Sequence, residues 1–384
     1  MLPKTADVIV IGGGVMGAST AYHLAARGCP NVVLLERNEF LGSEATGKCA
    51  GGIRYQFSTE INVRLSQLSL PMLERFEEEL GQPIDLRWPG YLFLIDNERD
   101  LATFRTNVAM QNRLGVPSHI LTAAEVTARV PLLNLSGIIG GAYNAHEGLA
   151  DPSGVVQGYA AGARRRGVQI FTNTAVTAVC VEGGRISGVD TADGHIAAPV
   201  VVNTSGPWAG AVGRMAGVDV PVVPVRRQIA VTAPLAELPP DFPFVIDFST
   251  ALYFHREGKG ILTGQANPNQ PVGFDQSVDH AWAERHLDWA VERFPLLAKA
   301  GLLREWAGLY EVTPDAHPII DGPAGPAGFY IAAGFSGHGF MHGPITGVLM
   351  SELILDGGAH TLDIRQLRLS RFAEGDLVRE HNVV

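Results

Sequence analysis

Residues 6–36, ADVIVIGGGVMGASTAYHLAARGCPNVVLLE, decide the fold of this chain. A β-branched run over residues 6–12 predicts a buried parallel strand. Good helix formers over residues 15–27 predict a helix, and a second β-branched run over residues 31–35 predicts a strand that ends at Glu36. Strand, glycine turn, helix, strand and acid follow one another in the order of a dinucleotide-binding unit.

Three glycines with the spacing G-x-G-x-x-G connect the first strand to the helix. Gly12 allows a tight turn, Gly14 lets backbone N–H groups approach a pyrophosphate, and Gly17 lets the helix pack close to the strand. The positive end of the helix, which begins with Val15 and Met16, then faces the phosphates.

Glu36 follows the third glycine by about 20 residues, the spacing at which an acid accepts hydrogen bonds from ribose hydroxyls. A carboxylate in this place repels a 2′-phosphate, which disfavours NADP. The unit therefore predicts an adenine dinucleotide, and the motif alone leaves NAD and FAD open.

The composition excludes several classes of protein. Of the 384 residues, 46% are hydrophobic and 18% are charged, which suits two interleaved domains with a large core and is too apolar for a disordered chain. The 29 basic and 39 acidic side chains give a net charge of −10 without a basic run. Nucleic acid and anionic membranes are therefore poor partners.

The cysteines and the N-terminus bear on location. Cys29, Cys49 and Cys180 are too few and too scattered for a disulfide framework or a metal site, so we expect no metal and a reducing, cytoplasmic compartment. The first strand begins close to Met1, which leaves no room for a targeting peptide. No apolar run of about 18 residues occurs, so we expect no transmembrane helix.

A second glycine-rich stretch, GSEATGKCAGGIR over residues 42–54, predicts a loop whose hydroxyls and bare backbone contact phosphates and a flat ring. A flexible surface loop is the alternative, but the stretch ends on a lone cation, Arg54. The candidate cofactor-binding residues of the loop are Ser43, Thr46, Lys48, Cys49, Ala50, Gly51, Gly52 and Ile53.

The rest of the chain alternates helices and strands. A helix over residues 59–80 is predicted, with Ser58 as its N-cap and a kink at Pro71. Further helices are expected over residues 97–114, 121–130, 151–166, 208–216 and 280–294. Strands are expected over residues 90–95, 168–171, 175–181, 185–189, 199–203 and 328–332, and strands of an antiparallel sheet over residues 222–232, 244–247, 251–255 and 260–264.

Two later segments return to the cofactor. The strand over residues 199–203 runs into small residues, which places Ser205, Gly206 and Trp208 at a strand carboxyl end. Residues 333–344, AGFSGHGFMHGP, form a glycine-rich loop before a helix predicted over residues 345–355 with Pro344 in its first turn. The candidate residues of this loop are Gly334, Gly337, His338, Gly339, Phe340 and Met341.

The glycine-rich loop of residues 333–344 helps to distinguish an FAD site from an NAD site. A reduced flavin carries negative charge around N1 and the C2 carbonyl, and backbone N–H groups with a helix N-terminus stabilise that charge. An NAD-binding domain has no such need, so the second glycine-rich turn favours FAD.

These segments together resemble the D-amino-acid oxidase superfamily, which includes sarcosine oxidases, glycine oxidase, dimethylglycine dehydrogenase and the β subunits of archaeal-type L-proline dehydrogenases. Residues 46–57 look most like the sarcosine oxidase β and proline dehydrogenase β subgroup. The matching pieces span nearly the whole chain and are residues 11–17, 34–37, 46–54, 203–208, 306–308, 313–315 and 333–340.

The resemblance implies an α/β fold of two domains. The first is a discontinuous Rossmann-type, GR2-like FAD-binding domain made of residues 1–82, 145–220 and 325–384. The second is an α+β substrate-binding domain made of residues 83–144 and 221–324, whose antiparallel sheet covers the flavin.

The implied reaction is hydride transfer from the carbon next to an amine to flavin N5, giving an imine that hydrolyses. Such chemistry needs a neutral amine, a fixed C–H bond and an anchored carboxylate. The lead hypothesis is an FAD-dependent oxidoreductase for a small secondary or N-methyl amino acid such as sarcosine or L-proline. The alternatives are a glycine or D-amino-acid oxidase, a non-autonomous flavoprotein β subunit that needs an electron acceptor or partner subunits, and an NAD-dependent dehydrogenase.

The resemblance also implies roles for single side chains. Arg54 matches an arginine that binds the substrate carboxylate, with a structural ion pair as the alternative. Tyr310 matches an active-site tyrosine and Tyr253 lies close to another, with core packing as the alternative for both. His338 is expected beside the flavin without proton chemistry. The remaining cofactor-binding candidates are Arg37, Val176 and Gly308.

One departure from the family concerns the substrate. Met341 stands where sarcosine oxidases carry a lysine that pairs with the carboxylate, so one anchor is missing. The candidates for a second cation are Lys48, Arg256 and His342, and the residues do not choose among them.

Two further departures concern the cofactor. Gly308 stands where a cysteine links to the flavin, so non-covalent FAD is expected, and Cys49 is expected to be a small buried residue rather than a tether. Leu262 stands near the place of a lysine that activates oxygen, which favours a dehydrogenase that passes electrons to another acceptor.

Overall fold

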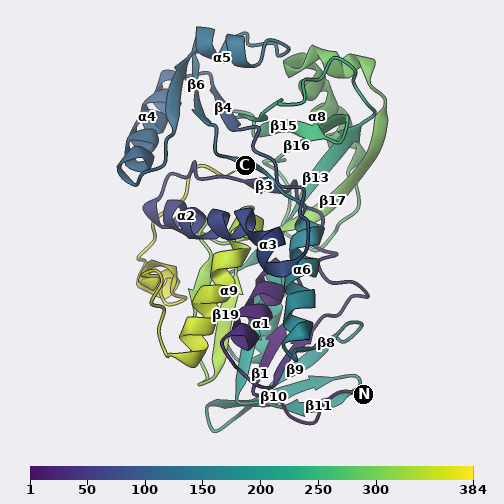
Figure 1. The fold of residues 1–384 in the computed structure, drawn as a ribbon, viewed down its shortest axis with the longest axis vertical. Helices are drawn as coiled ribbons and strands as arrows, with labels where there is room; N and C mark the ends of the chain where they lie inside the picture. Colours follow the sequence, from purple (N-terminus) through teal and green to yellow (C-terminus); the bar gives the residue numbers. More distant parts are fainter. Residues whose placement is uncertain (384) are drawn as a thin grey trace.

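The computed structural model describes residues 1–383, which form two large β-sheets at opposite ends of an elongated molecule (Figure 1). The N-terminus lies at the end that holds the six-stranded sheet, and the C-terminus lies between the two halves (Figure 1). The mixed α/β fold with an antiparallel component agrees with the prediction.

The six-stranded sheet is built around the strand that the opening glycine motif follows. Five adjacent strands are parallel, and the sixth is an antiparallel strand at one edge. The β-branched strands at its centre are buried on both faces, as expected of a parallel sheet. In spatial order the strands are β18 (Ile319–Asp321), β19 (Phe329–Ala333), β12 (Val200–Asn203), β1 (Val8–Ile11), β2 (Val32–Leu35) and β8 (Gln169–Phe171).

Helix α1 (Val15–Ala26) packs against α6 (Pro152–Arg165) and α9 (Gly339–Leu355) beside this sheet (Figure 1). The contact between α1 and α9 is close because α9 presents glycines to α1. A Cβ at Gly343 would lie 2.5 Å from Val15 Cγ2, and a Cβ at Gly347 would overlap Ser19. Asp151 caps helix α6, since its carboxylate accepts the Ser153 and Gly154 N–H groups.

The helix predicted over residues 59–80 is divided into α2 (Glu60–Glu74) and α3 (Phe76–Leu80). Pro71 lies inside α2, where it has no N–H to donate, and the helix ends one turn later at Arg75. The N-cap residue is Thr59 rather than the predicted Ser58, because Glu380 holds the backbone N–H groups of both residues.

A three-stranded antiparallel sheet flanks the parallel sheet at the lower end of the molecule (Figure 1). Its strands are β9 (Val176–Glu182), β10 (Arg185–Thr191) and β11 (Gly194–Ala197). The predicted helix over residues 208–216 is a 3₁₀ turn, η1 (Gly206–Trp208), followed by α7 (Ala209–Met215).

The eight-stranded sheet fills the other half and is antiparallel except where β14 runs parallel to β4. In spatial order its strands are β17 (Leu302–Val312), β13 (Val223–Thr232), β16 (Gly260–Gln265), β15 (Leu252–Glu257), β14 (Phe244–Asp247), β4 (Tyr91–Ile95), β6 (Gly140–Asn144) and β5 (His119–Thr122). Its helices are α4 (Glu98–Arg113), α5 (Ala123–Arg129) and α8 (His280–Arg293), and Thr122 caps α5 in a capping box with Glu125.

One sequence prediction about the C-terminal part of the chain is wrong, and one strand was missed. Helix α9 begins at Gly339 rather than at residue 345, so Pro344 lies inside the helix and not in its first turn. Strand β17 was not predicted, because its outer half is exposed and carries charged residues without clean alternation. Tertiary pairing with β13 holds β17 in the sheet.

The remaining elements are short: β3 (Gly52–Ile53), β7 (Gly148–Leu149), η2 (Pro295–Lys299), η3 (Arg365–Leu367) and α10 (Arg371–Glu374). Strand β3 pairs with β7 and continues the glycine-rich loop of residues 42–54. Among residues 1–383, no helix combines the length and the apolar character needed to cross a membrane. The compartment stays a prediction.

Candidate active site

A cavity of about 420 Å³ lies between the carboxyl ends of the parallel strands and one face of the eight-stranded sheet. The segments after β1, β2, β12 and β19 line one side, and residues of β13, β14, β15 and β17 line the other. The carboxyl edge of a parallel sheet is where doubly wound folds bind nucleotides. The two predicted glycine-rich turns, one near each end of the chain, therefore meet at the same cavity.

Nearly all of the predicted cofactor-binding and active-site residues line this cavity. Three do not. Gly17 lies behind the cavity, where a Cβ would overlap the Gly12 carbonyl oxygen. Glycine at this position therefore allows the close helix–strand packing that the motif predicts. Ile53 is fully buried in the core, and Gly334 donates its N–H to Glu311 Oε2 at 3.0 Å.

The glycine turn is held by side chains from the next two segments. Glu36 Oε2 accepts the Gly13 N–H at 2.7 Å, and Glu36 Oε1 accepts the Asn38 N–H at 2.8 Å. Thr46 Oγ1 accepts the Val15 N–H at 3.2 Å at the start of α1. A Cβ at Gly14 would lie 3.2 Å from the same hydroxyl, so a larger residue would crowd the turn. The cradle fits a dinucleotide pyrophosphate.

Arg37 and Lys48 build the outer wall of the cavity. The Arg37 guanidinium lies 3.5 Å from the centroid of the Trp208 ring. Lys48 pairs with Glu44 at 3.2 Å and donates to Gln276 Oε1 at 2.5 Å, while its carbonyl accepts the Trp306 indole N–H at 3.0 Å. Lys48 is therefore an engaged wall residue and not a free cation for a substrate.

The start of α9 lies against the cavity. Gly337 has φ +100°, and a Cβ there would overlap the Tyr310 ring, so the turn requires glycine. His338 Nδ1 lies 2.5 Å from the Phe335 carbonyl oxygen, within hydrogen-bond distance of the backbone. Burial lowers the pKa of His338 well below its usual value, so its ring is neutral.

His342 and Arg256 do not supply the second cation either. Burial, with the charge of Arg54, lowers the pKa of His342 to about 3, and the ring lies outside the cavity. Arg256 donates to the Gly258 carbonyl at 2.9 Å and is not among the residues that line the cavity.

Arg54 is 5% exposed and lines the cavity. Its guanidinium donates to the carbonyls of Gln56, at 2.5 Å, and of Asn382, and lies 4.0 Å from the centroid of the Phe57 ring. It forms no ion pair with any residue of the described chain, so the alternative of a structural ion pair is not what the geometry shows. Burial lowers the pKa of Arg54, and the charges of Glu380 and Glu147 oppose that shift without forming an ion pair with it.

Tyr253 and Tyr310 come from β15 and β17 and face the same cavity. Burial raises the pKa of Tyr253 well above its usual value and raises that of Tyr310, so both phenols are neutral hydrogen-bond donors. Burial likewise raises the pKa of the Cys49 thiol to about 11, which keeps it protonated.

Among the cavity residues that the sequence reasoning missed are Tyr91, Arg227, Phe244 and Glu311. The Tyr91 hydroxyl lies where a Cβ at Gly52 would stand, and its ring stacks on Phe244 with centroids 4.2 Å apart. The sequence did hold a signal for Arg227. Residues two apart on a strand share one face, so Arg227 points to the same side as the apolar Ile229, which also lines the cavity.

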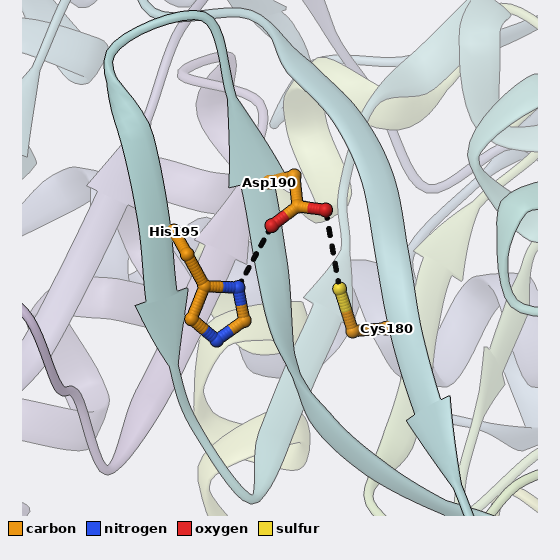
Figure 2. Close-up of side chains that lie close together, drawn as sticks. All are labelled: Cys180, Asp190 and His195. Atoms are coloured by element: carbon orange, nitrogen blue, oxygen red, sulfur yellow. Dashed lines mark hydrogen bonds and ion pairs between the residues drawn. The ribbon is translucent and has the colours of Figure 1, made fainter.

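A second polar cluster lies outside the cavity, on the three-stranded sheet (Figure 2). Cys180, Asp190 and His195 bring their ligand-type atoms within 4.8 Å of one another, which the scattered cysteines in the sequence did not predict. Asp190 uses both carboxylate oxygens, one 2.8 Å from His195 Nδ1 and the other 3.6 Å from Cys180 Sγ. Both oxygens of Asp190 are therefore used within the cluster.

Comparisons with known proteins agree with this geometry. Sarcosine dehydrogenase of Homo sapiens, a mitochondrial protein, is 33% identical over 99% of this chain, and dimethylglycine dehydrogenase of Mus musculus, also mitochondrial, is 31% identical over 92%. The alignments cover 43% and 42% of those relatives, so the chain spans less than half their length.

Solved structures are similar over their whole length. L-Proline dehydrogenase from P. horikoshii superposes with a TM-score of 0.90 at 33% identity, covering 98% of this chain and 100% of that one. Glycine oxidase from Geobacillus kaustophilus gives a TM-score of 0.86 at 25% identity, covering 96% and 99%. A family model, DAO, described as FAD dependent oxidoreductase, matches residues 7–353. The chain is therefore an enzyme of the DAO family of FAD-dependent oxidoreductases.

Proposed function

We propose that this enzyme oxidises the C–N bond of a small secondary or N-methyl amino acid, similar to sarcosine or proline, and gives an imine. The observation that carries the proposal is the unpaired guanidinium of Arg54 at the cavity wall. The relatives named for sarcosine, dimethylglycine and L-proline support the substrate class.

Arg54 anchors the substrate through its carboxylate. Two backbone carbonyls hold the guanidinium in place without cancelling its charge. A carboxylate that enters the cavity supplies the missing charge and accepts the remaining N–H groups, the strongest hydrogen-bonding pair available to a protein. Such an anchor fixes the amine and the reacting C–H bond relative to the cofactor.

FAD supplies the chemistry when bound, because it accepts a hydride equivalent. The glycine turn after β1, Glu36 and Thr46 would hold its adenosine and pyrophosphate, and the loop of residues 46–54 with the start of α9 would hold its ring. We propose non-covalent binding. Gly308 offers no nucleophile, and the protonated thiol of Cys49 is a poor one.

We propose further that residues 1–82, 145–220 and 325–384 form a GR2-like FAD-binding domain and that residues 83–144 and 221–324 form the substrate-binding domain. The strand order supports this division. The six-stranded sheet contains strands from all three outer segments, and every strand of the eight-stranded sheet comes from the two inner ones. The edge strand β18 is the exception, because it lies within residues 221–324 and joins the six-stranded sheet.

The inner wall of the site keeps water from the reacting atoms. Phe244, Ile246 and Ile229 are buried side chains that line the cavity beside the two tyrosines. Tyr253 and Tyr310 stay neutral, so they donate hydrogen bonds and take no proton at neutral pH. These two phenols therefore do not deprotonate the amine, which the proposed hydride transfer needs in its neutral form.

The electron acceptor is proposed to be other than oxygen. Leu262, near the place of the family's oxygen-activating lysine, is apolar, is buried in one core cluster with Tyr253, Phe244 and Ile246, and does not itself line the cavity. Without a cation at that place, negative charge that develops on oxygen is not stabilised. A dye acceptor with or without partner subunits distinguishes an autonomous dehydrogenase from a subunit of a larger complex.

The test is an anaerobic substrate panel on the purified yellow protein. We expect sarcosine, proline or another secondary amino acid to bleach the flavin absorption band, and slow reoxidation by air. Rapid peroxide formation with glycine or D-alanine would favour the oxidase alternative. A flavin that dithionite reduces but that stays oxidised throughout a broad amino-acid panel would contradict the proposal.

A further inference from the structure

Arg227 is a second buried cation in the same cavity. It lies on β13 opposite Gly308 of β17, and it lines the cavity beside Ile229. Its guanidinium carbon is 5.0 Å from the centroid of the Tyr310 ring. The side chain therefore faces the half of the cavity that holds Tyr310 and Tyr253, away from the glycine turn after β1.

The hydrogen bonds of Arg227 are incomplete. One terminal nitrogen donates to the Arg226 carbonyl at 3.1 Å, and Nε is buried with no hydrogen-bond partner. Within residues 1–383, Arg227 makes no ion pair. A buried guanidinium N–H without an acceptor costs free energy. A ligand that supplies the acceptor removes this cost and therefore binds more tightly.

The neighbouring arginine gives the contrast. Arg226 pairs with Asp275 at 2.8 Å and with Asp279 at 3.6 Å, and it also donates to the Ser277 carbonyl at 2.8 Å. The same residue type on the same strand is therefore neutralised on one face of the sheet and left unpaired on the face that meets the cavity.

The charges of Arg54 and Arg227 both influence Tyr310. Burial raises the pKa of Tyr310, and the charges of Arg227 and Arg54 both oppose that rise. Two guanidinium groups thus approach the Tyr310 phenol, and the described chain pairs neither of them with an acid.

The acids near this region have other partners. Glu311 Oε2 accepts the Gly334 N–H, and burial raises the pKa of Glu311 to about 7. Glu147 accepts three N–H groups from Tyr55 and Gln56. Glu380 is held by the side chains of α2 and its N-cap. None of these acids forms an ion pair with Arg54 or Arg227 in the described residues, although the charges of Glu380 and Glu147 offset part of the burial of Arg54. The cavity therefore presents two guanidinium groups without a direct acidic partner.

From this pair of charges we infer that the substrate carries two carboxylates, one bound by Arg54 and the other by Arg227, with the amine between them. The inference rests on the proposed function and narrows its substrate class to N-carboxyalkyl amino acids. Oxidation removes a hydride from the carbon next to nitrogen and a proton from the amine, and FAD takes up both. Water then adds to the resulting imine, and the C–N bond breaks to give a primary amino acid and an oxo acid.

The experiment uses probes that differ by one carboxylate. Sarcosine and iminodiacetate share the N-substituted glycine core, and only iminodiacetate has the second acid. Methylthioacetate and thiodiglycolate are the corresponding thioethers, with one and two carboxylates, in which sulfur replaces the oxidisable amine. The readouts are anaerobic flavin reduction with the amines and perturbation of the flavin absorption spectrum by the thioethers, both on the FAD-loaded enzyme.

In the unaltered enzyme we expect a higher kcat/KM for iminodiacetate than for sarcosine and tighter binding of thiodiglycolate than of methylthioacetate. Arg227→Gln should raise KM for iminodiacetate and Kd for thiodiglycolate by about 100-fold, the loss of one charged hydrogen-bonded pair, with changes under about 3-fold for the monocarboxylates. Arg227→Lys should restore part of the loss. Arg226→Gln is the matched control and should leave both ratios unchanged.

The outcomes separate the inference from the proposed function. Oxidation of sarcosine or proline with no response to either dicarboxylate overturns the role of Arg227 and leaves the proposed function standing. An equal loss for both members of each pair in Arg227→Gln, or a loss of FAD content, also overturns it, because Arg227 then serves the cofactor or the fold. A flavin that no amine in the panel reduces contradicts the proposed function itself.

Discussion

At the scale of single residues, the chemistry of this site depends on a buried arginine that has no ion-pair partner among the described residues. Arg54 is nearly inaccessible to water, yet its two hydrogen-bonding partners are neutral carbonyls. Removing the Arg54 charge breaks no direct ion pair, and the nearby acids Glu147 and Glu380 keep their own hydrogen bonds, so the substitution should act on binding more than on folding.

At this scale we predict that Arg54→Gln lowers kcat/KM for the substrate found in the panel by about 100- to 1000-fold, since truncating one partner of a buried charged pair costs about 3–4 kcal/mol. Flavin content and thermal stability should change little, because no ion pair is broken in the free enzyme. Arg256→Gln, at a cation outside the cavity, is the control. Unchanged kinetics in Arg54→Gln would remove the main support of the proposed function.

Among the elements, α1 and α9 decide the shape of the cofactor site. Both helices begin at the cavity wall, and they pack along each other without intervening side chains at Gly343 and Gly347. The distance between the two helix starts is therefore set by glycines that lie away from the cavity.

We predict that Gly347→Ala destabilises the enzyme by about 1–3 kcal/mol, because the new methyl group overlaps Ser19 and forces α9 away from α1. The variant should also release FAD more readily in a dilution assay. Gly358→Ala is the matched control, since no atom lies within 4 Å of a Cβ there. A Gly347→Ala protein with the melting temperature and FAD retention of the control would show that the close contact is not needed.

Across the whole molecule, the C-terminal segment closes the site from behind. Glu380 is buried and accepts hydrogen bonds from Ser58, Thr59 and Asn62, while the Asn382 carbonyl accepts from Arg54. Residues more than 300 positions apart thus share one network, and the arginine proposed to bind substrate depends on the end of the chain.

This network predicts a pH dependence. Burial alone would raise the pKa of Glu380, but hydrogen bonds from Ser58 and Thr59 outweigh it and hold the pKa below the usual 4.5. A carboxylate with a depressed folded pKa contributes stability that is present above the unfolded pKa and is lost as the pH falls through the folded value. The enzyme should therefore lose this contribution below about pH 4.5.

Glu380→Gln should lose about 2–4 kcal/mol at pH 7 and should show a shallower fall in stability below about pH 4.5. It should also raise KM, because Asn382 no longer fixes Arg54. Denaturant unfolding at several pH values measures the first two effects. Glu374→Gln, at an exposed acid of the same segment, is the control. A Glu380→Gln protein with the same acid profile as the unaltered enzyme would contradict this account.

The sequence by itself determined the parts of this protein that depend on near neighbours. The strand, glycine turn, helix, strand and Glu36 lie within about 30 residues, each justified by backbone geometry or by the ligand, and the structure has them in that form. The resemblance of segments along the chain indicated the FAD-dependent family, which the comparisons confirm.

Only the tertiary structure decided which distant residues meet. Arg227, Tyr91 and Glu311 enter the cavity because sheet register turns their side chains inward, and no local pattern encodes register between strands far apart in the chain. The start of α9 at Gly339 likewise depends on packing against α1, which overrides the weak helix propensity of its glycines. The sequence analysis found one carboxylate anchor missing, because Met341 replaces a lysine. Long-range packing brings another cation, Arg227, into the cavity.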